Sequence, residues 1–358
     1  MTTPKSQFKK YIYVFGTILL LSLLFIFAAA IYFQPLEGEL TRLGSYSERD
    51  FGWNLPQKKV RGDANMAKDY QGYYDVLIVG DSFSTNGVWQ PFFRKETGLS
   101  YVTLDVRKTH IYDLLDSQSF RNHPPKVFIV QSVEREIVYF FSNLSFPCIN
   151  NDNNNVKINL SFRPPGTSTE YYEEIRKTFD IRNINLRYTA SVMFNAVIRK
   201  LHGRDLKYTQ KYNLLSHSLF SNTKSNEILV YAGDIDKLNW KREGLTKSIC
   251  AIRGLQNLVQ KHGKTLFIFM LAPDKSTAYA DYIAEPVFQT RLNIQQQFID
   301  SGVNAPRIDL KLNQAIESGI KDIYLPSGTH WSATGYEIAA KCIVDFIKQH
   351  SIEDEKSH

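Results

Sequence analysis

Cysteine is scarce in this 358-residue chain, and the three that occur are widely spaced at Cys148, Cys250 and Cys342. Three scattered cysteines are too few for a disulfide scaffold or a cysteine–zinc cluster. No histidine, cysteine or carboxylate spacing typical of a metal site is present, and no glycine-rich loop would cradle a phosphate. We therefore expect neither a metal nor a cofactor. In an oxidising compartment one disulfide is possible, which would leave one thiol unpaired.

The excess of positive over negative charge is also small. Lys and Arg number 43 against 36 Asp and Glu, a formal charge of +7, and three of the lysines (Lys5, Lys9 and Lys10) lie in the first ten residues. No basic block with interleaved aromatic residues follows, so nucleic acid is not an expected partner. At 43% hydrophobic and 22% charged residues, the chain is neither disordered nor a coiled coil.

One long hydrophobic run is present, at residues 11–33, and it contains no charge. A helix of that length crosses a hydrocarbon core of about 30 Å. Lysines precede the run and Glu37 and Glu39 follow it, so the positive-inside bias keeps the short basic stub 1–10 in the cytoplasm. The alternative is a cleaved signal peptide ending near 28–30, although such apolar regions usually have about 7–15 residues. We expect a single-pass anchor in the inner membrane, with the bulk of the chain outside the cytoplasm.

Beyond a polar stalk or lead-in at 34–71, strand and helix signals alternate. Expected strands lie at 75–79, 101–105, 126–133, 265–271 and 305–310, and expected helices at 88–97, 111–119, 242–262, 287–301 and 333–349. This alternation predicts an α/β fold with a parallel sheet covered by helices on both faces. The expected domain spans 72–349, followed by a tail at 350–358. It is interrupted at 142–240 by an insertion with a polar tract at 150–155 and a helical pattern at 170–200, which we expect to be mainly helical.

A candidate nucleophile follows the first strand, in Gly80-Asp81-Ser82-Phe83. A serine at a strand-to-helix turn is presented at the carboxyl end of the sheet, where its hydroxyl is accessible and its N–H can face an oxyanion. Gly80 permits the tight backbone, and Asp81 can accept N–H bonds within the turn. The competing interpretation is an ordinary turn, because Gly, Asp and Ser are all turn formers.

A candidate base lies 248 residues downstream, where His330-Trp331 stands in an expected loop before the last helix. A nucleophilic serine needs a base to take its proton, and a histidine on a neighbouring loop supplies one. Together, the serine turn and the His-Trp pair resemble the two ends of the SGNH (GDSL-type) hydrolase superfamily.

Two further segments resemble the AlgX/AlgJ-like branch of that superfamily, whose members are exported and implicated in O-acetylating polysaccharides. The segment 271–279 is similar to the Pro-x-Lys-Ser-x-x-Tyr stretch of the branch, and 133–135 matches it after the third strand. The resemblance implies that Ser82 carries an acyl group and His330 acts as base and then acid. Trp331 would pack the His loop or line the acyl pocket. The remaining implied pocket residues, at the mouth of the site, are Arg135, Lys275, Ser276 and Tyr279.

The chain departs from the family pattern in several places. The positions before His330 that usually hold an orienting Asp are Ser327 and Gly328. Asp322, Asp309, the Ser327 hydroxyl or a backbone carbonyl are the candidate replacements. The usual Asn after the third strand is absent from 131–134, and no glycine stands at 107–110 to provide a second oxyanion donor. In AlgX and AlgJ the His motif precedes the serine, whereas here it follows.

The resemblance leads to three hypotheses for the function. The first is an outward-facing O-acyltransferase that acetylates a cell-surface or exported polysaccharide, for which a multi-pass membrane acyltransferase would supply the acetyl groups. The second is an esterase of the same fold. The third is a non-catalytic glycan-binding assembly subunit, which the missing Asp and Asn favour.

Overall fold

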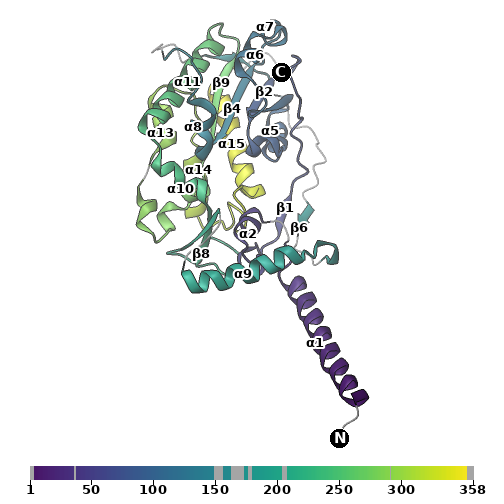
Figure 1. Ribbon diagram of the computed structural model, residues 1–358. Helices are drawn as coiled ribbons and strands as arrows, with labels where there is room; N and C mark the ends of the chain where they lie inside the picture. Colours follow the sequence, from purple (N-terminus) through teal and green to yellow (C-terminus); the bar gives the residue numbers. More distant parts are fainter. Residues whose placement is uncertain are drawn as a thin grey trace.

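The computed structural model describes residues 4–35, 38–148, 156–162, 173–175, 180–203, 208–290 and 292–352. A single long helix, α1 (Pro4–Tyr32), projects from a body that contains the sheet and the remaining helices (Figure 1). Residues 8–32 of α1 are long and apolar enough to cross a membrane. The expected apolar helix is therefore present, and the large apolar side chains at positions 8–27 are exposed, whereas Ala29 and Ala30 at its end are buried against the body.

The central sheet consists of four parallel strands in the described part of the chain, in the order β3-β2-β4-β9. They are β2 (Val76–Gly80), β3 (Tyr101–Asp105), β4 (Val127–Val133) and β9 (Leu266–Ala272). Their continuous apolar runs are buried on both faces, as a parallel sheet between helical layers requires. All four were expected from the sequence, and the predicted α/β fold is confirmed.

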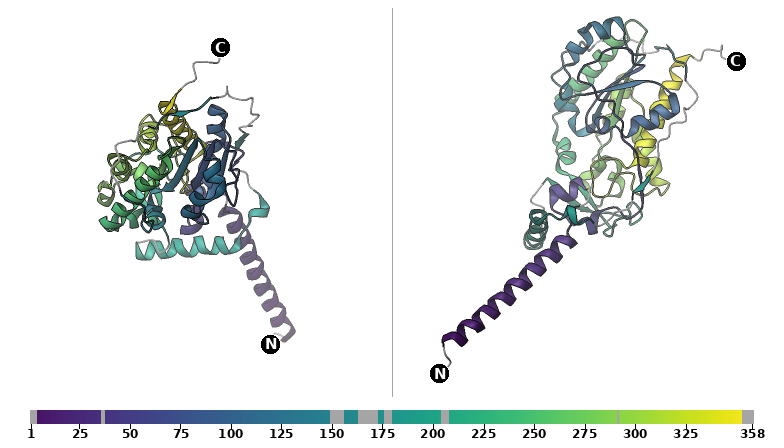
Figure 2. Two further views of the ribbon diagram at one scale, coloured as in Figure 1. Left: turned by 90° about the horizontal axis from the view of Figure 1, so that it is seen from above. Right: turned by 90° about the vertical axis from the view of Figure 1, so that its right-hand side faces the viewer.

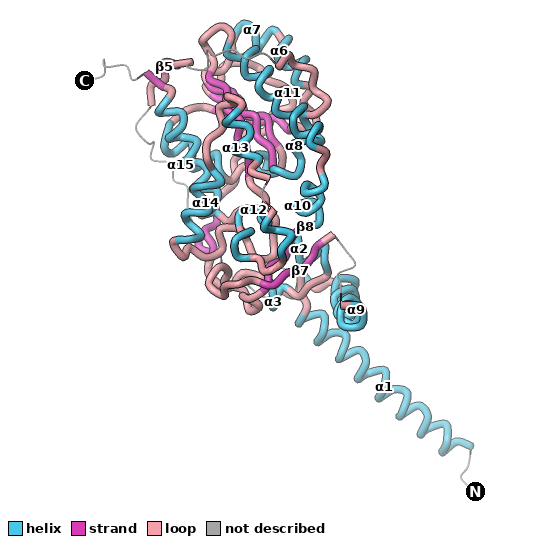
Figure 3. Tube along the Cα trace, turned by 90° about the vertical axis from the view of Figure 1, so that its left-hand side faces the viewer, coloured by secondary structure: helices cyan, strands magenta, loops and turns pink. Residues whose placement is uncertain are grey.

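Two helical layers enclose this sheet (Figures 1 and 3). One face of β2, through Val76 and Ile78, packs in a cluster with helices on one side of the sheet, and the other face, through Leu77 and Val79, packs with helices on the opposite side. The first layer comprises α5 (Trp89–Thr97), α14 (Ile308–Glu317) and α15 (Ala333–Gln349). The second comprises α6 (Ile111–Asp116), α7 (Gln118–Asn122), α8 (Ile137–Phe141), α11 (Arg242–Gln260) and α13 (Ile294–Asp300).

The strand expected at 305–310 is absent, because α14 begins at Ile308. The segment before it makes one ladder-like contact, in which Phe269 N donates to Asn304 O at 2.8 Å. Pro306 then removes a donor that a further ladder would need. The helix expected at 287–301 is also shorter: a 3₁₀ turn at Pro286–Gln289 precedes α13, which spans the last turns of that range.

The insertion contains strands as well as a helix. Its long helix is α9 (Leu186–His202), which begins later than expected, and β7 (Thr209–Asn213) pairs antiparallel with β8 (Glu227–Tyr231). Short elements complete its described part: β5 (Ile158–Asn159), β6 (Glu173–Ile175), a 3₁₀ turn at Ile181–Asn183, α10 (Ala232–Asp236) and a 3₁₀ turn at Lys237–Asn239. The short β5 pairs with β10 (Ser351–Ile352) beyond α15. The polar tract 150–155 lies outside the described residues.

The segment expected to be a stalk folds onto the body. It forms α2 (Glu39–Gly44), α3 (Glu48–Phe51) and β1 (Gln57–Lys59), the last paired with β6. Leu40, Tyr46 and Phe51 are buried in one cluster with Leu229 of β8. The aromatic residues scattered through 36–71 are thus a packing surface, and the chain leaving α1 is held against the insertion.

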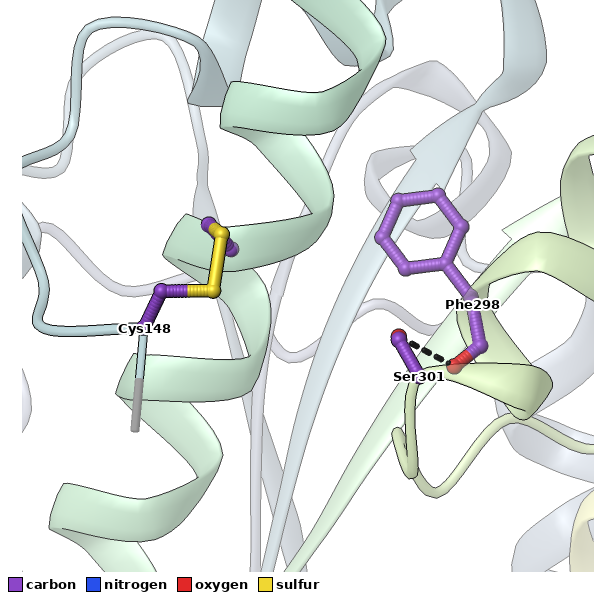
Figure 4. Close-up of a disulfide and its surroundings, with 4 residues drawn as sticks. Cys148, Phe298 and Ser301 are labelled. Carbon is purple, nitrogen blue, oxygen red and sulfur yellow. Dashed lines mark hydrogen bonds between the residues drawn. A yellow bond between two sulfur atoms is a disulfide. The ribbon is translucent and has the colours of Figure 1, made fainter. Parts of the chain in front are cut away.

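A disulfide joins Cys148 to Cys250, across 102 residues of sequence, and leaves Cys342 as a buried thiol. It links the loop that enters the insertion to α11 (Figure 4). The expectation of one disulfide and one spare thiol is met.

Candidate active site

Ser82 stands where the sequence placed it, at the turn from β2 to the short helix α4 (Ser82–Thr85). This is the carboxyl end of the sheet, where parallel α/β folds place their sites. Gly80 is needed here because an added Cβ would come within 2.6 Å of the Gln131 side-chain oxygen. As the first residue of a helix, Ser82 has a backbone N–H without an acceptor inside that helix.

Asp81 is fully buried and fixes the turn that presents Ser82. Its carboxylate accepts from Phe83 N at 2.9 Å, from Val133 N at 2.7 Å and from the Gln131 side-chain amide at 2.9 Å. The Gln131 oxygen in turn accepts from Asp81 N at 3.0 Å. Asp81 therefore ties the end of β2 to the end of β4, and the two hydrogen bonds with Gln131 strengthen the same link.

His330 lies beside Ser82, on the loop that leads into α15. Its Nε2 is 2.9 Å from Ser82 Oγ. The imidazole packs against the ring of Phe83, with 4.7 Å between centroids, and Phe83 also meets Trp331 edge-on at 4.8 Å. Trp331 is itself buried. Of the two roles expected for Trp331, the structure supports packing of the His loop.

The other nitrogen of His330 has a carboxylate partner that the sequence analysis did not identify. His330 Nδ1 lies 2.9 Å from Oε2 of Glu39, the first residue of α2. The same oxygen accepts from Thr329 Oγ1 at 2.6 Å. The backbone also joins the two segments, because Leu40 N donates to Ser327 O at 2.8 Å. Ser82, His330 and Glu39 thus form a continuous serine–histidine–carboxylate chain.

The charge of Glu39 fixes the tautomer of His330. Partial burial favours a higher pKa, but the hydrogen bond and charge of His330, followed by the Thr329 bonds, outweigh it and lower the pKa of Glu39 from 4.5 to about 2. An ionised carboxylate can only accept, so Nδ1 carries the proton and Nε2 presents its lone pair to the Ser82 hydroxyl. This is the orientation that a general base requires.

The carboxylates proposed from the sequence to orient His330 lie elsewhere. Asp322 accepts from Ser221 N at 2.8 Å, and Asp309 pairs with Arg307 at 2.8 Å. Both are nearer to His330 in sequence than Glu39 is, yet the fold directs them to other partners. The sequence offered only an indirect signal for Glu39. A histidine base without its usual Asp needs another carboxylate, and Glu39 precedes the apolar Leu40, which is buried in the fold.

Lys275, Ser276 and Tyr279, expected at the mouth, lie beneath it. All three are buried, on or just after the short helix α12 (Lys275–Ala278), which leads into a 3₁₀ turn at Ala280–Tyr282. Lys275 Nζ donates to the carbonyls of Leu325, Pro326 and Gly328 at 3.0, 2.7 and 3.3 Å. Burial lowers the pKa of Lys275 to about 7. The lysine thus supports the His330 loop from behind, because those carbonyls are the polar groups its amine can reach.

Tyr279 and Ser276 pack in the core beside Lys275. The ring of Tyr279 packs at a tilt against that of Phe220, with 4.7 Å between centroids, and its hydroxyl accepts from Tyr324 N at 3.4 Å. Ser276 borders a separate hollow of about 180 Å³ near Lys237. Neither residue reaches the cleft that holds His330.

Arg135 lies at the mouth, as expected. It sits in a 3₁₀ turn (Glu134–Glu136) directly after β4, and its guanidinium donates to Asp274 at 2.6 Å and to Asp234 at 3.2 Å. It does not pair with its neighbour Glu134, which binds Lys237 at 2.7 Å instead. Lys237 also binds Asp274 at 2.7 Å. This buried network joins the insertion to the loops after β4 and β9 and holds Arg135 in place.

An open cleft of about 550 Å³ gives access to the histidine. It is bordered by the His330 loop, α2, and residues at the ends of β4 and β8: Glu39, Arg42, Leu43, Arg135, Glu136, Tyr231, Thr329 and His330. Arg135 lies over the Tyr231 ring at 5.4 Å. Two cations and an aromatic ring beside a serine–histidine pair suit a polar, oxygen-rich ligand. Among the described residues, no group of three or more metal-ligating side chains gathers at this or any other place.

The family comparison concerns the C-terminal part of the chain. Residues 229–358 match the family model for the SGNH hydrolase-like domain of the acetyltransferase AlgX. A "Probable alginate O-acetylase AlgJ" of Pseudomonas putida is 26% identical over 113 residues, which are 30% of this chain and 29% of that protein. The chain thus spans less than a third of the length of that relative. No solved structure matches the chain.

These findings confirm the resemblance to the AlgX/AlgJ-like branch of the SGNH superfamily that the motifs predicted. The family match includes Lys275 and His330 but begins after Glu39 and Ser82. The roles of those two residues therefore depend on the geometry of this structure.

Proposed function

We propose that this protein is a membrane-anchored, outward-facing O-acyltransferase that acetylates an exported or cell-surface polysaccharide through an acyl-Ser82 intermediate. The observation that carries the proposal is the placement of His330 between Ser82 Oγ and Glu39 Oε2, at 2.9 Å from each. The similarity to AlgX and AlgJ supports the acetyl group and the polysaccharide.

In the first half-reaction, His330 Nε2 takes the proton of Ser82 as Oγ attacks the acyl carbonyl of the donor. The carbonyl oxygen becomes an oxyanion, toward which the Ser82 N–H can donate. As the intermediate collapses, the bond from the carbonyl carbon to the donor oxygen breaks. His330 returns its proton to that leaving oxygen, and the acyl group stays on Ser82 as an ester. Glu39 stabilises the imidazolium that forms between the two proton transfers.

The second half-reaction runs the same steps with a sugar hydroxyl. His330 takes the hydroxyl proton, the sugar oxygen attacks the acyl carbon, and the bond to Ser82 Oγ breaks as Ser82 recovers its proton. Arg135 and Tyr231, at the rim of the cleft, are placed to bind the acceptor. Water would give hydrolysis instead, so transfer needs the acceptor to displace water from the cleft.

The anchor and its orientation have independent support. The apolar helix α1 stands clear of the body, and Lys9 and Lys10 lie at its distal end. A disulfide at Cys148–Cys250 fits an oxidising compartment, outside the cytoplasm. Such a location separates the enzyme from cytoplasmic acyl donors, so we propose a multi-pass membrane acyltransferase as the supplier.

The proposal is tested by acylating the purified full-length chain in detergent with an activated acetyl ester. Intact mass should show an adduct of about 42 Da on the wild type and none on Ser82→Ala or His330→Ala. Adding acetyl-free oligosaccharides should then discharge the adduct into acetylated sugar. Release as free acetate alone would favour the esterase. A folded wild type that takes up no acetyl group would point to the non-catalytic glycan-binding subunit.

A further inference from the structure

Helix α9 exposes an unexplained apolar stripe. Leu186, Phe194, Val197 and Leu201 are 57–72% exposed, and Ala190 lies among them in the sequence. Their spacing of four, four, three and four residues places all five on one face of the helix. A soluble surface rarely carries large apolar side chains in such an ordered row, and a contiguous patch of this kind marks an interaction site.

The opposite face of α9 is fastened to the body. Tyr188, Val192 and Asn195 are buried there, and the Tyr188 hydroxyl donates to Tyr46 O. Ser191 Oγ is 2.7 Å from Ser45 Oγ. The stripe therefore cannot turn inward by rotation of the helix without breaking these contacts. It points away from the body.

The position of α9, next to the end of the apolar span of α1, points to a bilayer surface as the partner of the stripe. The helix lies across the base of the body, beside the end of α1 that enters it (Figures 1 and 2). The side chain of Gln34, two residues beyond α1, donates to Asp180 O just before α9, and Arg49 lies over the Tyr32 ring at 4.1 Å. The apolar span of α1 ends at Tyr32. If α1 crosses a bilayer, α9 stands at the height of the bilayer surface.

The charges around the stripe fit lipid headgroups. Arg187 and Lys200 are exposed on α9 itself. At the start of the helix, Arg42, Arg182 and Arg187 line a hollow of about 660 Å³ between α2 and α9. Basic residues beside an apolar helical face are typical of helices that lie in the interface of a membrane with anionic phosphates.

We propose that α9 is an interfacial membrane helix that inserts its Leu186–Leu201 stripe into the outer surface of the bilayer that α1 crosses. The proposal rests on the membrane anchoring in the proposed function. With α1 and α9 both engaged, the body has two attachments instead of one. It cannot tilt freely about the end of α1, and the cleft is held at a fixed height and direction above the lipid.

The test places an environment-sensitive fluorophore on single introduced cysteines of the full-length chain, reconstituted into phosphatidylethanolamine–phosphatidylglycerol vesicles. Three positions are compared: Phe194→Cys on the stripe, Leu21→Cys within α1, and Gln118→Cys on α7. Gln118 is exposed and lies at the end of the body far from α1 (Figure 1). Nitroxide-labelled lipids report which labels contact acyl chains.

Quenching at Phe194→Cys several-fold stronger than at Gln118→Cys, with a blue-shifted emission, supports the proposal. Quenching at Leu21→Cys without quenching at Phe194→Cys overturns it while leaving the anchor intact. Absence of quenching at Leu21→Cys would instead contradict the anchoring itself. Labelling Val197→Cys repeats the test independently of the Phe194 side chain, so a local folding defect at one position does not decide the result.

Discussion

Glu39 and His330 are 291 residues apart in the chain, yet a 2.9 Å hydrogen bond joins them. Glu39 lies seven residues after the end of α1, and His330 lies just before the final long helix α15. The carboxylate bound to His330 is thus supplied by the segment that directly follows the apolar helix α1. In the proposed enzyme, the anchor-proximal segment is part of the catalytic machinery.

Replacing Glu39 by Gln should lower the rate of Ser82 acetylation by about 10²–10⁴-fold, because an amide leaves His330 in the wrong tautomer or without its partner charge. The size and packing of the side chain hardly change, so the thermal melting of the variant should stay close to wild type. Stopped acetylation assays on the full-length chain measure the rate. Glu136→Gln, at the rim of the same cleft, is the matched control. Equal rates for Glu39→Gln and wild type would remove Glu39 from the mechanism.

Thr329→Val should have a smaller effect, up to about tenfold, because it removes one charged hydrogen bond to Glu39 and leaves the bond to His330 in place. Thr329→Ser keeps the hydroxyl and should restore most of the rate. A comparison of kcat for the two variants with the same acetyl ester checks this. A Val variant as slow as Glu39→Gln would mean that Thr329 contributes more than alignment of the carboxylate.

Lys275→Met should loosen the His330 loop, because the buried carbonyls of Pro326 and Gly328 would lose the lysine as their donor, while Leu325 O would keep only its bond from Gly328 N. An unsatisfied buried group costs about 1–3 kcal/mol. We expect a lower melting temperature together with slower acetylation. Lys261→Met, an exposed lysine at the end of α11, should change neither quantity. Full stability in Lys275→Met would show that the loop is held by its aromatic packing.

The buried charge network makes stability depend on pH through Asp234. Burial, and then repulsion from Asp274, raises the pKa of Asp234 from 3.8 to about 7. Between about pH 4 and about pH 7 the folded protein holds a proton on Asp234 that the unfolded chain has released. The stability that this group contributes is therefore present below about pH 4 and is lost as pH rises toward 7.

Asp234→Asn removes this dependence. The melting temperature of the variant minus that of the wild type should therefore be higher at about pH 8 than at about pH 5. Scanning calorimetry of the full chain in detergent at both values measures the difference. A relative loss near pH 8 would show that the ion pair with Arg135 outweighs the cost of ionising Asp234.

Removing the Cys148–Cys250 disulfide should destabilise the protein by about 2–4 kcal/mol, since the bond closes a loop of 102 residues. The double variant Cys148→Ser, Cys250→Ser, compared in denaturant with wild type, gives the value. Cys342→Ser, which replaces the buried free thiol, serves as the control because it removes a cysteine without removing a disulfide. An unchanged midpoint in the double variant would contradict a structural role for the disulfide.

The sequence sufficed for those features that short segments determine. Four strands were predictable because their runs of apolar residues are buried on both faces, and Ser82 because its turn follows β2 directly. The prediction of a strand at 305–310 was wrong because it relied on the pattern of apolar residues and did not take into account that Pro306 has no N–H to donate to a strand ladder. Lys275 was expected at the mouth from the family resemblance alone, and only the fold shows the three carbonyls to which its buried amine donates.

Glu39 was beyond sequence reasoning for a different reason. Its partner is set by how α2 packs on β8 and on the loop before α15, and nothing local to 39–44 specifies that contact. The same holds for α9, whose apolar residues were part of an expected helical pattern but gave no sign of which ones face outward. Both features arise from the same region, where the chain leaves α1 and meets the insertion.

In the proposed membrane-anchored enzyme, the order in which the chain crosses the membrane determines when activity begins. With the N-terminus anchored, translocation delivers Glu39 first, Ser82 soon after and His330 only near the end of the chain, and β9 and the Lys275 support also arrive late. During export the nucleophile is therefore exposed without its base. The protein would be chemically silent while still in transit, and it would gain activity in one step when the last loop closes over the sheet.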